Sequence, residues 1–176
     1  MSRPGAGVLI AGIGNVLLGD DGFGVEVARR LADLPLPPGV VVGEYGIRGM
    51  HLAYELLDGQ FGGLILVDAV PLDDPPGTVA VLDVAPDDAR IAGTVDAHGM
   101  DPVTVLGLLR RLGGTVGRVR VVGCRPAVLE ERLGLSDVVR AAVEPAARLT
   151  LDLAADLAGK ANEYRPEHTV GRRNRR

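Results

Sequence analysis

Three aspartates and one histidine have the residue types and positions that could bind a metal ion or activate a water molecule. Asp20 and Asp21 lie in the glycine-rich stretch GIGNVLLGDDGFG, Asp68 ends the apolar run LILVD, and His98 lies in a loop before a well-capped helix start. Two carboxylates and an imidazole suit a borderline divalent ion such as nickel or zinc, with coordination positions left open. Activation of water by paired carboxylates, Asp21 and Asp68, is the alternative.

Each of these residues also has a purely structural interpretation. Asp20 or Asp21 could cap the helix that follows the glycine-rich stretch. An acidic residue after a strand as apolar as the one before Asp68 usually either caps the next turn or faces a functional crevice. A single loop histidine such as His98 is more often not a ligand. The spacing alone does not decide among these interpretations, because no HExxH or CxxC motif is present.

Other kinds of site are disfavoured by what the sequence lacks. The dinucleotide-binding pattern GxGxxG fails because its third glycine position holds Leu17, and no GK[ST] phosphate-binding loop is present. No GxSxG motif marks a nucleophilic serine. Ser136 is instead expected to cap the last helical region, and Cys124 follows a valine-rich strand, where a cysteine usually belongs to the core.

Apolar periodicity predicts strands that alternate with helices. The strands are expected near residues 8–11, 40–45, 64–67, 78–82 (an edge strand) and 119–122, and the helices near 24–31, 50–57, 102–112 and from 136 onward, with a break or restart at Pro145. This alternation predicts an α/β fold, a single three-layer αβα domain with a twisted, mostly parallel sheet flanked by helices. Ligand sites of such sheets lie beyond the carboxyl ends of the strands, which is where Asp68 and the loop of Asp21 are expected.

Composition and charge indicate the class of protein. The 176-residue chain is 47% hydrophobic with only 3% aromatic residues, so Val, Leu, Ile and Ala must build the core. We expect a domain over residues 1–160 and a basic, solvated and mobile tail over 161–176, which leaves a body too acidic to favour nucleic acid. No apolar run is long enough to span a membrane. A single cysteine excludes an intramolecular disulfide, and we predict a cytoplasmic protein with no membrane or nucleic-acid partner.

Four segments, in order, resemble a known family. The stretch GIGNVLLGDDGFG is similar to the N-terminal signature of the hydrogenase maturation proteases. The segment LILVDA with Asp68 resembles the strand-end aspartate of that family, and DAHGMDP with His98 resembles its histidine loop. The segments VVGCRP and LGLS resemble its late strand and last helix. The resemblance covers roughly residues 7–158.

This resemblance implies a twisted mixed sheet between helices and three metal-contacting residues, carried over to Asp21, Asp68 and His98. It implies a nickel-dependent endopeptidase that recognises nickel already installed in the large-subunit precursor of a nickel-iron hydrogenase and releases a C-terminal extension. The nickel would come from this precursor, so the isolated protein could hold none. A nickel-sensing chaperone that does not cleave the precursor, or a metallohydrolase that keeps its own zinc, are the alternatives.

The chain departs from the family pattern at two places. The first ligand position is often glutamate in the family and is Asp21 here, which keeps the acid but shortens its reach by one methylene. A DGGT-like turn often follows the second strand, whereas this chain has EYGIRG at residues 44–49 without the threonine. The substrate contacts of that turn therefore cannot be carried over.

The first departure leads to a prediction. Asp21→Glu should keep substantial cleavage of the nickel-loaded precursor, whereas Asp21→Asn and Asp21→Ala should lose it. A carboxylate is a stronger ligand for a divalent ion than a neutral amide, and the adjacent helix N-terminus favours the ionised form by roughly 0.3–1 kcal/mol. The rate of loss of the extension measures this. Asp20→Asn, run in parallel, should be milder, and the reverse ranking would assign the role to Asp20.

Overall fold

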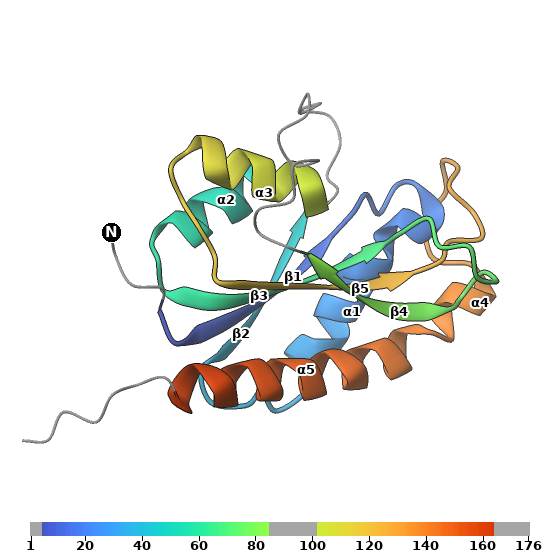
Figure 1. The fold of residues 1–176 in the computed structure, drawn as a ribbon. Helices are drawn as coiled ribbons and strands as arrows, with labels where there is room; N and C mark the ends of the chain where they lie inside the picture. Colours follow the sequence, from blue (N-terminus) through green and yellow to red (C-terminus); the bar gives the residue numbers. More distant parts are fainter. Residues whose placement is uncertain (1–4, 85–101, 164–176) are drawn as a thin grey trace, which may run out of the picture.

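A computed structural model of the chain describes residues 5–84 and 102–163, and it contains one five-stranded sheet (Figure 1). The strands are β1 (Gly7–Ile13), β2 (Val40–Gly46), β3 (Phe61–Ala69), β4 (Val79–Val84) and β5 (Arg118–Cys124). The helices are η1 (Gly19–Gly22), α1 (Phe23–Ala32), α2 (Gly49–Leu57), α3 (Pro102–Arg111), α4 (Asp137–Arg140) and α5 (Val143–Glu163). In the strand order β2-β1-β3-β5-β4, only β4 is antiparallel to its neighbour. The α/β fold with a mostly parallel sheet is confirmed.

Helices cover both faces of the sheet, with α2 and α3 on one face and α1 and α5 on the other (Figure 1). Side chains along β3 alternate between the two apolar clusters, because successive residues of a strand point to opposite faces. Leu64 and Leu66 pack with α2 and α3, while Ile65 and Val67 pack with α1 and α5. A strand buried on both faces needs an unbroken apolar run, which explains the sequence LILV.

Two glycines let α1 approach the sheet very closely. A Cβ atom at Gly24 would lie 1.9 Å from the carbonyl oxygen of Val67, and one at Gly12 would lie 2.3 Å from the carbonyl oxygen of Gly24. Neither position has room for a side chain. The first turn of α1 is therefore held directly against the ends of β1 and β3.

The chain leaves β1 and β2 toward opposite faces of the sheet. β1 continues into α1 on one face and then into β2, which continues into α2 on the other face and then into β3. Because β1 leads to β2 on one side and β3 leads to β4 on the other, the connections diverge between the carboxyl ends of β1 and β3. In parallel sheets, a ligand crevice is expected at such a point of divergence. Asp21 follows β1 and Asp68 ends β3, so both lie at this end of the sheet.

The C-terminal helical region restarts near Pro145, as expected. α4 ends at Arg140, and Pro145 lies in the first turn of α5, where the missing N–H group of proline leaves no helix hydrogen bond unmade. Among the described residues, no helix combines the length and the apolar character needed to cross a membrane.

The close approach of α1 leads to a stability prediction. Gly24→Ala should lower the free energy of unfolding by about 3 kcal/mol, because the added methyl group collides with two backbone carbonyls that cannot move independently. Gly159→Ala is the matched control. Its Cβ meets nothing within 4 Å, and the change should raise helix stability by roughly 0.5–1 kcal/mol. Urea denaturation measures both, and equal midpoints would show that α1 can shift to accommodate a side chain.

Candidate active site at the carboxyl ends of β1 and β3

Asp68 is buried at the carboxyl end of the sheet. It is the penultimate residue of β3, opposite Gly123 of β5, and only 4% of its surface is exposed. The alternation of β3 turns its side chain to the same face as Leu64 and Leu66. The predicted position of Asp68 at a strand end is therefore confirmed.

Asp21 reaches the same place from the loop after β1. It lies in η1, is half-buried, and its Oδ2 accepts a hydrogen bond of 2.7 Å from the backbone N–H of Asn15. Gly14 adjoins both acidic residues. A Cβ atom there would lie 1.9 Å from the carbonyl oxygen of Asp21 and 3.4 Å from Oδ1 of Asp68. Gly14 also has a φ of +125°, which favours glycine. Gly14 thus lies next to the backbone carbonyl of Asp21 and the carboxylate of Asp68, so the two residues flank one glycine.

The third predicted ligand, His98, lies outside the described residues, and so does the loop that carries it. Within residues 5–84 and 102–163, no group of three or more His, Cys, Asp and Glu side chains is arranged to hold a metal ion. The described part of the chain therefore supplies a pair of carboxylates, and the histidine ligand stays a prediction.

Asp20 is completely buried and has a structural role that the sequence did not reveal. Its carboxylate accepts four hydrogen bonds from the segment after β5. They come from the backbone N–H groups of Ala127 (2.9 Å), Val128 (2.8 Å) and Ser136 (2.7 Å) and from the Ser136 hydroxyl (2.8 Å). The backbone N–H of Asp20 in turn donates to the carbonyl of Val128 (2.9 Å). Asp20 thus ties the loop of Asp21 to residues 127–136.

This network corrects two structural interpretations of the sequence. Neither Asp20 nor Asp21 caps α1, because the N-cap position is Gly22 and no side chain caps it. Ser136 does occupy the N-cap position of α4, but its hydroxyl donates to Asp20 and makes no capping hydrogen bond. The contacts join residues more than 100 positions apart, so local sequence patterns could not show them.

Burial raises the pKa of Asp20, but the hydrogen bonds from Ser136, Val128 and Ala127 outweigh that effect and hold the pKa below its ordinary value. The carboxylate is therefore ionised at neutral pH and fully engaged. It cannot turn toward the crevice without breaking this network.

Cys124 does not have the character of a nucleophile. It is fully buried at the end of β5, and burial raises the pKa of its thiol to about 11. At neutral pH the thiolate form is therefore scarce, and the thiolate is the nucleophilic form. The expectation that Cys124 belongs to the core is confirmed.

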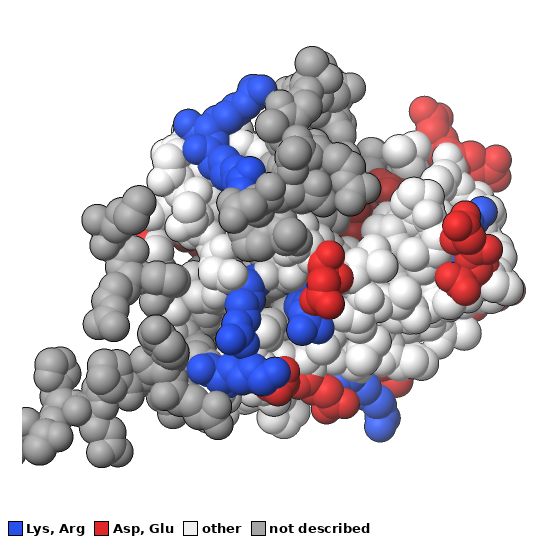
Figure 2. Space-filling model, viewed as in Figure 1, with Lys and Arg blue, Asp and Glu red and all other residues white. Residues whose placement is uncertain are grey.

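The face of the molecule shown in Figure 2 carries charges of both signs. Acidic side chains stand out toward the right of the view, and several basic side chains lie toward the left.

The Asp20 network leads to a pH-dependent prediction. Asp20→Asn should lower the free energy of unfolding by about 3 kcal/mol at neutral pH, because buried donors then face an amide that presents only one acceptor oxygen. A lowered pKa contributes stability that is present above the unfolded pKa of about 3.9 and is lost as the pH falls through the folded pKa. The difference between wild type and variant should therefore shrink as the pH falls below about 3.9. Urea titrations across this range measure it, and a difference independent of pH would contradict the role of the charge.

Comparisons with known proteins agree with this geometry. A family model described as hydrogenase maturation protease matches residues 25–153. The hydrogenase 2 maturation protease of Escherichia coli is 32% identical over 141 residues, which are 79% of this chain and 85% of that protein. A solved hydrogenase maturating endopeptidase of Escherichia coli superposes with a TM-score of 0.68 at 28% identity, over 85% of this chain and 93% of that one. A hydrogenase 2 maturation peptidase from a Thaumarchaeota archaeon gives 0.65 at 32% identity, over 84% and 97% of the two chains. This chain therefore belongs to the hydrogenase maturation protease family and is a peptidase.

Proposed function

We propose that this peptidase removes a C-terminal extension from the nickel-loaded large-subunit precursor of a nickel-iron hydrogenase. The observation that carries the proposal is that Asp21 and Asp68 both adjoin Gly14 at the end of the sheet where β1 and β3 finish. Membership of the family supports the substrate class. The single cysteine suits a reducing compartment, so we place the reaction in the cytoplasm.

The two aspartates are held by different means and can serve different purposes. Asp68 projects from the central sheet and is almost fully shielded from solvent, so its position is rigid. Asp21 is half-buried on a loop, and the hydrogen bond from Asn15 fixes one of its oxygens. The second oxygen could then contact a ligand or accept a proton from an attacking water.

The chemistry of these donors fits the nickel of a substrate. Two carboxylates, with His98 as the proposed third ligand, leave positions open for groups that the precursor provides. Nickel held in this way would supply a Lewis acid that polarises the scissile carbonyl or lowers the pKa of a water. Asp21, Asp68 and His98 would orient the precursor at that centre, and the dependence on nickel would restrict cleavage to a filled precursor.

Cleavage should therefore require nickel in the precursor. We expect loss of the extension from nickel-loaded precursor and at least a hundredfold slower loss from nickel-free precursor, measured by intact mass. Asp68→Asn should leave both forms uncut while the thermal midpoint shows that the variant is folded.

The same experiment separates the alternatives. Equal processing of the two precursors would overturn nickel dependence. Complex formation without any mass change would indicate a nickel-sensing chaperone, and tightly held stoichiometric zinc in the purified protein would indicate a zinc metallohydrolase.

A further inference from the structure

Two hollows flank the free edge of β2. The first, which we call the apolar hollow, has a volume of about 480 Å³ and lies between residues 14–17 and residues 44–48, with Val25 and Arg29 of α1 also lining it. The second, the polar hollow, measures about 310 Å³ and follows residues 41–45 of β2 beside Arg48, His51 and Glu55. The two share Glu44, Tyr45 and Arg48 but lie on opposite faces of the sheet, the apolar hollow beside α1 and the polar hollow beside α2. They therefore flank the outer edge of β2, and we call this edge with its two hollows the groove.

The backbone of β2 offers unpaired hydrogen-bonding groups along this groove. β2 is an edge strand, bonded only to β1 within the described sheet. The N–H of Val8 in β1 donates to the carbonyl of Gly39, and Val8 lies opposite Val40 in a regular register as far as Glu44. In a parallel pair, alternate residues turn their backbone groups to the same side. The N–H and C=O of Val42 and the N–H of Glu44 therefore point outward, as an added strand requires.

Arg48 sets one end of this free edge. Its guanidinium donates to the carbonyl of Glu44 (2.6 Å) and to that of Tyr45 (3.2 Å), which satisfies the outward carbonyl beyond the free stretch. The carboxylate of Glu44 is in turn engaged by Arg29 (2.9 Å). Arg29 thus balances the charge of Glu44, and the free backbone of β2 gives the groove a means of recognising its ligand by backbone pairing.

The apolar hollow ends beside the proposed catalytic residues. Gly14 and Asn15 line it, and these are the residues that adjoin Asp68 and bind Asp21. At its mouth, the side chains of Leu17 and Ile47 are 59% and 64% exposed. Exposed apolar side chains of this size around a hollow are characteristic of a surface that another apolar group covers.

We propose that an extended segment of the large-subunit precursor lies in this groove, paired as an added strand with the outer edge of β2, and that it places an apolar side chain in the hollow between Leu17 and Ile47. This rests on the proposed function. A peptide bond that reaches Asp21 and Asp68 needs extended chain on at least one side. The free edge of β2 from Val42 to Glu44 provides a backbone template for such a chain, beside the apolar hollow that Gly14 lines.

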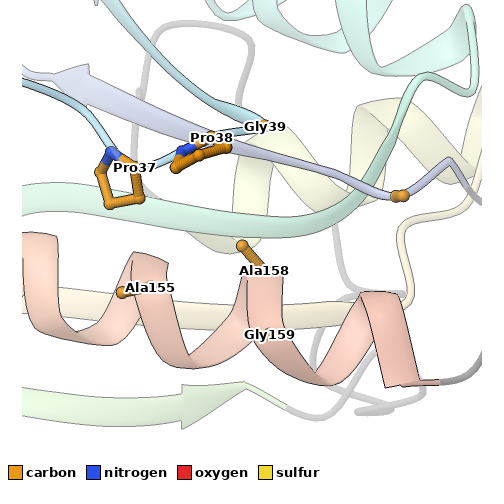
Figure 3. Close-up of a pocket in the computed structure, with 7 residues that line it drawn as sticks. Pro37, Pro38, Gly39, Ala155, Ala158 and Gly159 are labelled. Atoms are coloured by element: carbon orange, nitrogen blue, oxygen red, sulfur yellow. The ribbon is translucent and has the colours of Figure 1, made fainter.

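A larger hollow elsewhere does not suit this role. It has a volume of about 540 Å³ and lies between residues 37–39 and Ala155, Ala158 and Gly159 of α5 (Figure 3). It is at the amino ends of β1 and β2, the opposite end of the sheet from Asp21 and Asp68. Small and apolar residues line it, and no charged or hydroxyl side chain is among them.

Cross-linking tests the proposal without requiring cleavage. Ile47→Cys and the control Leu112→Cys, an exposed position beyond α3, are labelled with a thiol-directed photo-cross-linker, while the buried Cys124 stays unlabelled. Each is mixed with a nickel-loaded large-subunit precursor encoded in the same genome. We expect at least fivefold more cross-linking from position 47, mapped to the C-terminal segment of the precursor. Equal yields from both positions, or cross-links confined to the folded body of the precursor, would overturn the proposal.

Amide hydrogen exchange tests the strand pairing. Binding of the same precursor should slow exchange at Val42 and Glu44 at least tenfold, whereas Val41, already bonded to β1, should change little. Unchanged exchange at Val42 and Glu44 would overturn the pairing. If the wild type cleaves the precursor but shows neither the cross-links nor the slowed exchange, the proposed groove is rejected and the proposed function stands. Cross-linking and protection without cleavage would reject the endopeptidase role and keep the groove.

Discussion

The buried carboxylate of Asp20 is the interaction on which the candidate site depends. It gathers four donors from residues 127–136 and holds the loop between β1 and α1 in one conformation. The next residue, Asp21, is thereby turned the other way, toward Asn15 and Gly14. The two adjacent aspartates thus differ in role. The carboxylate of Asp20 is fully engaged in holding the loop, whereas Asp21 lies near Asp68.

Close packing of the backbone between α1 and the sheet also positions the loop of Asp21. Gly12 and Gly24 allow α1 to rest on the ends of β1 and β3, and this contact fixes the height at which the loop of Asp21 leaves the sheet. Asp68 needs no such support, since it belongs to the central strand itself. Asp68 is therefore held rigidly by the sheet, whereas the loop of Asp21 is held by a network of hydrogen bonds.

The sequence was informative wherever the structure follows from local patterns. The run LILVD predicted a strand buried on both faces with Asp68 at its end. The three glycines and two aspartates after β1 predicted a loop whose side chains could bind a metal ion or take part in catalysis. The role of Asp20 was not predictable, because its partners follow it by more than 100 residues and have no motif of their own. The groove beside β2 could not be predicted from the sequence either, because it depends on which strand lies at the edge of the sheet. His98 fits the resemblance and remains a prediction.

The distance in sequence between Asp20 and its partners has a consequence for how the protein is made. β1, β2 and β3 are complete by Ala69, so three central strands can pair early during synthesis. The donors to Asp20 follow only at Ala127, Val128 and Ser136. Contacts of such long separation form late, because the intervening chain must first close a large loop. Asp68 therefore takes its place as soon as the central strands pair, whereas the loop that carries Asp21 gains its anchoring contacts only after the segment that follows β5 has been made.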